Sequence, residues 1–323
     1  MLGLIVRRLL QMIPLLFGIT FLTFAIVNLV PGSPVTGYVF NPRMRPEDIQ
    51  RIKENLGLDK PWPERYVIWV SHVLRGDLGL SMTNSTPVLD RILGVLPNTL
   101  LLTGTSVLLA LVVSIPLGVY AAVKHNSWFD HLTTMGAVAA FAMPTFWLAL
   151  LMILLFSVKF REWGLPSLPV GGMYDMRNPG GVLDRLEHLI LPAVSLALVQ
   201  MAAWMRYIRS SMLEVVGQDF IRTARAKGLR ERAVLSGHAF RNAVIPLITL
   251  VGLSVPELFG GAFFIEQIFA WNGMGRLTLQ AVNRSDYTLI MGATLMFALL
   301  TMVGNLLADI LYRVVDPRLR HEQ

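Results

Sequence analysis

Polar side chains inside long apolar runs are the residues of this 323-residue sequence that could act on a ligand. Asn28, Gln200, Glu257 and Asn305 are of this kind. A carboxylate at the depth of a bilayer is costly to desolvate, so Glu257 is a candidate for contact with an ion or a substrate. Glu257 could instead lie high enough to reach water or a neighbouring arginine. Glutamine and asparagine more often form hydrogen bonds between helices. Gln200 could do this, or it could contact a ligand that crosses the membrane.

The motifs of several enzyme classes are absent from the sequence. It has no G-x-x-x-x-G-K-[ST] phosphate-binding loop, so we expect no ATP hydrolysis by this chain alone. It has no G-x-S-x-G nucleophile motif, and its histidines show no H-E-x-x-H or other metal-ligand spacing. It also contains no cysteine, which excludes disulfides and thiolate metal sites. We therefore expect no catalytic residue, no cofactor and no metal on this chain.

A basic stretch between two apolar runs, residues 214–246, has the pattern of two short helices. Asp219 can cap the first helix, Lys227 lies in its last turn, and Gly228 can end it in a left-handed conformation. A helix of about nine residues is marginal in water by itself. We therefore expect this helix to exist only when it is packed against another surface.

The first helix of the stretch is amphipathic as well as basic. Phe220, Ile221 and Ala224 form its apolar stripe, and a second helix is predicted from Arg230 toward Asn242. Such an element between two membrane helices is suited to docking with another protein. It could equally be a basic loop that follows the positive-inside rule and rests on anionic lipid.

The sequence TARAKGL, residues 223–229, followed by HAFRNAVIPLIT, resembles the coupling-helix segment of bacterial ABC-importer permeases, in the form typical of the dipeptide, oligopeptide and nickel branch. Ala224 and Gly228 match the generic motif, whereas Arg222 replaces its glutamate and Thr223 replaces an alanine. Further stretches agree with this branch: RRLLQMIPLLFGITFLTF, GLDKPWPERY, RGDLGLS and DPRLR. The resemblance covers nearly the whole chain.

The resemblance implies one half of a transmembrane pore in an importer of peptides. It implies a second, paralogous permease subunit, two cytoplasmic ATPases that bind ATP and magnesium, and an extracytoplasmic substrate-binding protein. Movement of the ATPases would displace the docked helix as a rigid lever and alternate access to a site between the permeases. The apolar stripe would fill the ATPase groove and the cations would orient it. The residues implied in this coupling are Asp219, Phe220, Ile221, Arg222, Ala224, Arg225, Lys227 and Gly228.

A second part of the resemblance follows the fifth apolar run. The stretch from Glu266 to Arg276 matches the pattern E-x-x-F followed by G-x-G-R, which adds these two residues to the candidate translocation pathway. We expect Gly273 and Gly275 to form turns. Where the peptide branch carries an uncharged residue, this chain has Glu257. The cargo therefore stays open among dipeptides, longer peptides, nickel chelates and oligosaccharides.

The candidate residues named above must be positioned by apolar runs that are long enough to cross a bilayer. Hydrophobic residues make up 54% of the chain and charged residues 15%, which is typical of a polytopic membrane protein. We predict an all-α membrane bundle of about six spans, at 9–30, 92–123, 131–158 with a kink at Pro144, 189–205, 242–265 with an interruption at Pro256-Glu257, and 287–308.

Residues 31–97 form a polar segment that we place outside the membrane. We predict two helices in it, one at 46–55 and one that begins at Pro63 and has Tyr66 on its apolar face. The chain is accordingly divided into a first span at 1–30, this segment, a permease core at 98–312 with its coupling loop at 210–242, and a tail at 313–323.

Small residues recur every four positions in the second span. They are Ser106, Ala110, Ser114, Gly118 and Ala122. Membrane helices associate through close packing because lipid gives no hydrophobic drive between them. We therefore expect another helix to approach this stripe closely.

The formal charge of +7 is distributed unevenly along the chain. Six spans place both termini on one side, and the basic excess of the short loops lies on that side too. By the positive-inside rule this side is the cytoplasm. Topology thus explains the charge, and nucleic acid is not expected as a partner. We predict a multi-pass protein in the lipid bilayer of the bacterial inner membrane, with both termini cytoplasmic.

Two other classes of function stay open. An ion-coupled secondary carrier needs several ionisable residues at mid-membrane and usually an internal repeat, whereas Glu257 alone qualifies and no repeat is visible. An intramembrane enzyme or a purely structural subunit has no sequence feature in its favour.

Overall fold

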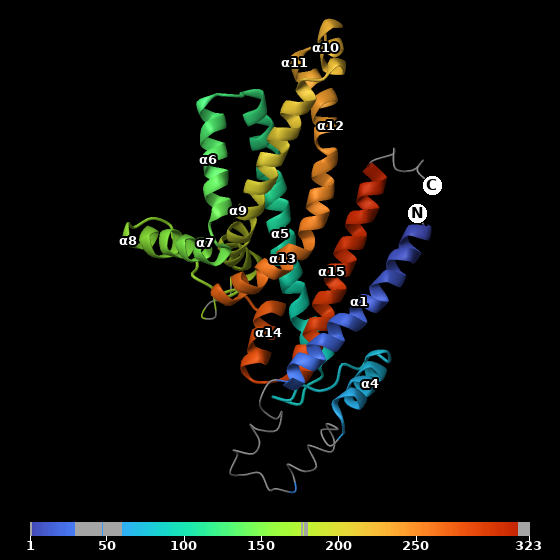
Figure 1. Cartoon of the computed structure of the whole chain (residues 1–323). Helices are drawn as coiled ribbons and strands as arrows, with labels where there is room; N and C mark the ends of the chain where they lie inside the picture. The colour runs from blue at the N-terminus through green and yellow to red at the C-terminus, as the bar shows by residue number, and fades with distance from the viewer. Residues whose placement is uncertain (1, 30–46, 48–59, 176, 178–179, 316–323) are drawn as a thin grey trace. The chain divides into compact units, whose positions relative to one another are not determined.

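The computed structural model describes residues 2–29, 47, 60–175, 177 and 180–315 (Figure 1). The regular elements among these residues are helices, apart from one isolated antiparallel bridge between Leu80 and Pro87. This confirms the predicted all-α class. The predicted helix at 46–55 and the tail from residue 316 lie outside the described residues.

Helices long and apolar enough to cross a membrane confirm a polytopic protein. Within the described residues they are Ile5–Leu29, Val88–Val123, Gly181–Val216 and Tyr287–Ile310. Two bent pairs raise the number to six if each pair is one span, namely Trp128–Ala142 with Thr145–Glu162 and Glu231–Ala243 with Ile245–Gly252. The six-span prediction therefore holds only if both bent pairs are counted as spans.

The chain folds as two compact units. The first consists of Met1–Pro97 and Arg276–Met302, and the second of Asn98–Gly275 and Val303–Gln323. Helices α5 (Val88–Val123), α14 (Met274–Asn283) and α15 (Tyr287–Val315) each contribute residues to both. The division of the sequence at residues 30, 97 and 312 stays a prediction.

In the first unit, α1 (Leu2–Leu29) and α4 (Trp62–Val73) meet through an aromatic cluster. Tyr66 is buried, and its ring centroid lies 5.5 Å from that of Phe17 and 5.4 Å from those of Phe21 and Phe24. The Tyr66 hydroxyl shares a 2.8 Å hydrogen bond with Oγ1 of Thr20. The helix predicted from Pro63, with Tyr66 on its inner face, is thus confirmed.

The RGDLGLS stretch, residues 75–81, docks onto the start of α15 in the same unit. Asp286 is fully buried there and accepts hydrogen bonds from the Ser81 hydroxyl, from the N–H of Met82 over 3.0 Å and from the N–H of Leu289 over 3.2 Å. Because the last of these bonds caps α15, one carboxylate both begins the helix and fixes the stretch.

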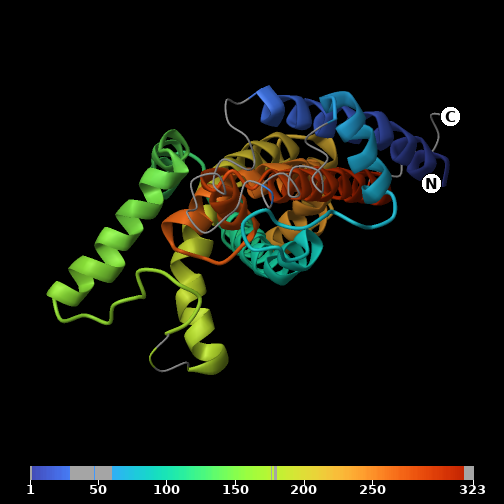
Figure 2. The same ribbon diagram turned by 90° about the horizontal axis from the view of Figure 1, so that it is seen from below.

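In the second unit, α6 (Trp128–Ala142) bends by 110° into a straight rod made of α7 (Thr145–Met152), η1 (Ile153–Lys159) and α8 (Phe160–Glu162), as Figure 2 shows. The sequence predicted a kink at Pro144 within one span. The bend is at that position, but it is much larger than a kink. Met143 is extended, with φ −85° and ψ 133°, because the residue before a proline disfavours the helical region.

Helix α9 (Gly181–Val216) is much longer than predicted. The predicted short span at 189–205 lies inside α9, so the span is confirmed with longer bounds. Of the Gly- and Pro-rich stretch 159–188, expected to be a loop, residues 163–175 are non-helical, but residues 181–188 are helical, so the loop prediction is wrong there. On the first turns of α9, Oδ1 of Asp184 lies 3.0 Å from Nδ1 of His188. A polar pair one turn apart supports a helix, although the sequence there is not apolar.

Helix α13 (Ile245–Ile268) is continuous through Pro256, so the predicted interruption of the span is also wrong. Prolines are tolerated in membrane helices when the freed backbone groups find other partners. The side chain of Glu257, the other residue of that predicted break, lies outside the described residues.

The small-residue stripe of α5 is buried against α9, as predicted. A Cβ atom placed on Gly118 would lie 2.8 Å from the carbonyl oxygen of Met205 and 2.9 Å from Cβ of Ile208. Only glycine allows so close an approach of the two backbones.

Candidate functional site

The basic stretch forms a compact helical element between α9 and α13. It consists of α10 (Asp219–Ala226), α11 (Glu231–Ala233), η2 (Val234–Phe240) and α12 (Arg241–Ala243). Figure 1 shows α10 and α11 at the end of α9 that is remote from α7 and α8. The two predicted helices are confirmed, with the difference that the middle of the second one is a π-helix.

The ends of α10 agree only in part with the predicted signals. The N-cap position belongs to Gln218, and Asp219 is the first helical residue, so the prediction that Asp219 caps the helix is wrong. Its carboxylate instead accepts a hydrogen bond from Arg222 over 3.3 Å. At the other end Gly228 has φ +76°, which confirms the predicted left-handed stop after Lys227.

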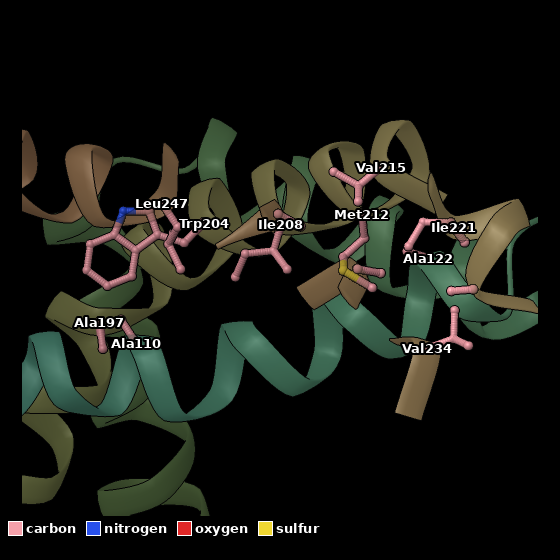
Figure 3. Packing of buried hydrophobic residues seen from close by; sticks show 13 residues of the cluster. Ala110, Ala122, Ala197, Trp204, Ile208, Met212, Val215, Ile221, Val234 and Leu247 are labelled. Carbon is pink, nitrogen blue, oxygen red and sulfur yellow. The ribbon is translucent and has the colours of Figure 1, made fainter. Parts of the chain in front are cut away.

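The inner face of α10 is part of the core of the second unit. Ile221 is 0% exposed and Ala224 is 5% exposed. Figure 3 shows Ile221 beside Met212 and Val215 of α9, Ala122 of α5 and Val234 of η2. Burial of a side chain as large as isoleucine is worth roughly 1.5–3 kcal/mol. This packing explains how an eight-residue helix can be stable.

The inward packing corrects one prediction. The sequence placed Phe220, Ile221 and Ala224 on one stripe that faces a partner, but Ile221 and Ala224 face the chain's own core. Residues three apart share a face of a helix, and this face points inward. Phe220 lies one position away from Ile221 and is 39% exposed. The two faces of α10 therefore differ in kind: the inner face is aliphatic and the outer face carries an aromatic ring among charged groups.

The outer surface of this element is basic. Its exposed cations are Arg222, Arg225, Lys227, Arg230, Arg232 and Arg241, and its exposed acids are Asp219 and Glu231. Arg225 and Glu231 form a two-point ion pair, with N–O distances of 2.8 and 3.2 Å, that joins α10 to α11. The hydrogen bond to Glu231 raises the pKa of Arg225 above its ordinary value, so Arg225 remains a cation. The surface can bind a partner with a polar or acidic groove and a pocket for Phe220.

The candidate pathway residues have different surroundings. Gln200 on α9 and Arg276 on α14 are half-buried. Glu266 at the end of α13 is fully buried, and its carboxylate accepts hydrogen bonds from Oγ1 of Thr99 over 2.6 Å and from the N–H of Gly275 over 2.7 Å. A carboxylate enclosed in this way holds the loop after α13. A role in the pathway stays a prediction for these residues and for Glu257.

The loop after α13 is held by a long-range hydrogen bond that the sequence could not indicate. Trp271 donates a hydrogen bond from Nε1 to the carbonyl oxygen of Asn98 over 3.0 Å, across a separation of 173 residues. A Cβ on Gly273 would overlap the Glu266 carboxylate. Gly273 lies at a bend, as predicted, whereas Gly275 lies in α14, so the turn prediction is wrong for it; close contact requires both glycines.

A group of three or more His, Cys, Asp or Glu side chains that could hold a metal ion does not occur among the described residues. The arrangement around α10 offers binding and mechanical linkage.

Comparison with known families agrees with this picture of a membrane component. The family described as "Binding-protein-dependent transport system inner membrane component" matches residues 114–321. The N-terminal part of such a membrane component matches residues 1–103.

Several relatives align with the chain from end to end. The oligopeptide transport system permease protein AppB of Bacillus subtilis is 43% identical over 318 residues, which are 98% of this chain and 99% of that protein. The dipeptide transport system permease protein DppB of Escherichia coli K12 is 41% identical, with 100% of both chains covered. The di/tripeptide transport system permease protein DppB of Pseudomonas aeruginosa is 39% identical with the same coverage. The chain therefore belongs to the family of binding-protein-dependent transport system inner membrane components.

Proposed function

We propose that this chain is one permease subunit of an ABC importer for di- or oligopeptides. It forms the translocation pathway with a second, paralogous permease subunit. Two cytoplasmic ATPases, which bind ATP and magnesium, drive it, and an extracytoplasmic protein delivers the peptide. End-to-end alignment with relatives whose names state dipeptide, tripeptide or oligopeptide transport supports this substrate class.

The observation that carries the proposal is the two-sided character of α10. Ile221 and Ala224 on its inner face are packed in the core, and its outer face exposes Phe220 and several cations. A lipid-facing basic loop would not need a buried inner face. A helix that receives force from a partner needs it, because the force must pass into the membrane helices.

The packing of α10 defines the elements that move with it. The residues around Ile221 come from α5, α9 and η2. Closely packed cores shift as rigid bodies between discrete arrangements. Displacement of α10 by the ATPases would therefore tilt α5 and α9 together and change access to a site between the two permease subunits.

Other cargoes and mechanisms serve as the alternatives to be tested. Nickel chelates and oligosaccharides fit the same architecture, and an ion-coupled carrier would need no ATPase. The bacterial inner membrane, with both termini in the cytoplasm, is the location that the proposal requires, because α10 must then lie on the side of ATP.

The test is uptake by proteoliposomes that contain the complex of this chain with its companion permease and ATPases, with the binding protein outside. We expect labelled di- and oligopeptides to accumulate only with ATP inside, without competition from nickel chelates or oligosaccharides. Uptake that follows an ion gradient without ATP would refute the proposal.

The docking role of α10 has its own test. Phe220→Ala removes an exposed ring on the first turn of α10, so the ATPases should be lost from the purified complex; an interface anchor of this type contributes about 2 kcal/mol or more. Leu183→Ala, an exposed residue on the first turn of α9, is the control and should retain them. Equal retention in both variants would mean that α10 does not bind the ATPases.

A further inference from the structure

A buried carboxylate joins three helices close to the α10 end of the second unit. Asp130, on the first turn of α6, is 1% exposed. It accepts hydrogen bonds from Nε of Arg209 and from Nη2 of Arg209 over 2.8 Å, and Arg209 belongs to α9. It also accepts a hydrogen bond from the N–H of Asn126 over 3.0 Å, which closes the turn between α5 and α6. One carboxylate therefore connects α9 to the α5–α6 turn.

The pair joins a buried carboxylate to a guanidinium whose side chain is 23% exposed. Removing two charges from water costs several kcal/mol per ion, and the attraction between them returns this only with well-formed hydrogen bonds. The guanidinium fork gives a planar, two-point contact that an ammonium group cannot reproduce. A pair of this kind fixes the distance and the angle between its two helices.

A second contact joins α6 and α9, one turn before Arg209 on α9 and about three turns after Asp130 on α6. The guanidinium of Arg206 lies 4.9 Å from the ring centroid of Phe141 on α6. Ala137 of α6, which lies between Asp130 and Phe141 in that helix, packs with Ala202 and Met205 of α9. The two helices thus meet through apolar side chains and through the contacts of Arg206 and Arg209.

The same stretch of α9 is linked to α10 and to α5. Met212 and Val215, one and two turns after Arg209, pack in the cluster that holds Ile221. Met205, one turn before Arg209, contacts the glycine of the α5 stripe, Gly118. A displacement at α10 therefore acts directly on α9 and α5, and Arg209 joins α9 to α6.

We propose that Asp130 and Arg209 are positioning residues for transport. They carry the displacement of α10 and α9 to the α5–α6 turn, so that α5, α6 and α9 move as one body. This inference rests on the proposed importer function for its link to transport. Its structural part, the joint movement of α6 and α9, holds independently of the cargo.

The test uses the assembled complex with its ATPases and the variants Asp130→Asn and Arg209→Lys. Asp130→Asn keeps an acceptor for Asn126 and removes the charge, while Arg209→Lys keeps the charge and removes the fork. Glu162→Gln, in the exposed Lys159–Glu162 ion pair of α8, is the matched control. We expect uptake per assembled complex to fall about tenfold in both variants, in line with the range of known coupling energies. The control should be unchanged.

A readout other than transport separates positioning from simple stabilisation. Cysteines introduced at Ala137 and Ala202 of this cysteine-free chain report the contact of α6 with α9 through cross-linking. With Asp130 and Arg209 intact, the yield should be the same with and without ATP and vanadate. With Asp130→Asn or Arg209→Lys, the yield should depend on the nucleotide.

The uptake and cross-linking results together distinguish a positioning role from a purely structural one. A nucleotide-independent yield in both variants, or full uptake per complex, would overturn the inference. Loss of uptake in proportion to lost folded protein, with unchanged cross-linking, would show a purely structural pair. If Asp130→Asn does not assemble, Arg209→Lys carries the same test. Failure of the unmodified complex to import peptides would refute the proposed function and leave the cross-linking result valid.

Discussion

The N–H of Gly275 donates a 2.7 Å hydrogen bond to Oε2 of Glu266, whose side chain has no exposed surface. The other carboxylate oxygen accepts a hydrogen bond from the Thr99 hydroxyl over 2.6 Å. Oγ1 of Thr99 in turn accepts a hydrogen bond from the N–H of Met274 over 2.8 Å. The end of α13, Thr99 of α5 and the first residues of α14 are thus joined through the Glu266 carboxylate and the Thr99 hydroxyl.

Glu266→Gln should therefore destabilise the protein. The amide of glutamine keeps one acceptor oxygen but presents an NH2 group to a donor, and a buried unsatisfied group costs about 1–3 kcal/mol. Thermal unfolding of the detergent-solubilised chain, followed by the loss of monodisperse protein, measures this. Gln267→Ala, at the exposed neighbouring position, is the control. Equal midpoints for the two variants would mean that the hydrogen bonds to Glu266 contribute nothing.

Gly118→Leu should separate α5 from α9. A side chain at this position would overlap Met205 and Ile208, and overpacking of this kind costs about 1–3 kcal/mol or more. We expect lower thermal stability and weaker assembly with partner subunits. Leu108→Ile, at an exposed position of the same helix, should be nearly silent in both measurements. A silent Gly118→Leu would show that the stripe is not a close helix contact.

The sequence predicted the features that depend on local chemistry. The glycine stop at Gly228, the α5 stripe and the helix from Pro63 with Tyr66 buried follow from residue type and spacing, and the structure confirms all three. Each of these signals is contained within a few turns of one helix, so that no knowledge of the tertiary structure was needed.

The errors concern features that tertiary contacts decide. The apolar stripe of α10 was recognised, but a stripe does not indicate whether its partner is the same chain or another one. The role of Asp130 depends on Arg209, which lies 79 residues away. The glycines and prolines between residues 159 and 188 indicated a loop, whereas the contact between Asp184 and His188 on the first turns of α9 is a pairing that hydropathy ignores. No feature of the sequence was used to predict the π-helices η1 and η2.

Cysteine labelling should place two exposed positions on opposite sides of the membrane. The charge distribution predicts Ser236, on η2, in the cytoplasm and Ser285, just before α15, outside. In intact cells a membrane-impermeant maleimide should therefore label Ser285→Cys, and should label Ser236→Cys only after the membrane is opened. The absence of native cysteine removes background from this chain. Labelling of Ser236→Cys from outside would refute the proposed orientation and, with it, the docking of cytoplasmic ATPases on α10.

Gly228→Val and Gly228→Asn should have different effects, although both add a side chain at the same place. The backbone of Gly228 has φ +76°, and nothing lies within 4 Å of a Cβ built on it, so steric overlap with neighbours is absent. What remains is the conformational cost: asparagine adopts the left-handed region readily, whereas a β-branched residue there is strongly disfavoured, at a cost of about 1–3 kcal/mol. Valine should therefore redirect the chain after α10, move the Arg225–Glu231 pair apart and reduce both ATPase retention and uptake. Asparagine should retain most of each.

The measurements are co-purification of the ATPases and ATP-dependent uptake, normalised to the amount of chain in the membrane. Equal losses for the two variants would show that the side chain and not the backbone angle matters here. Full activity of Gly228→Val would show that the direction of the chain after α10 has no part in coupling.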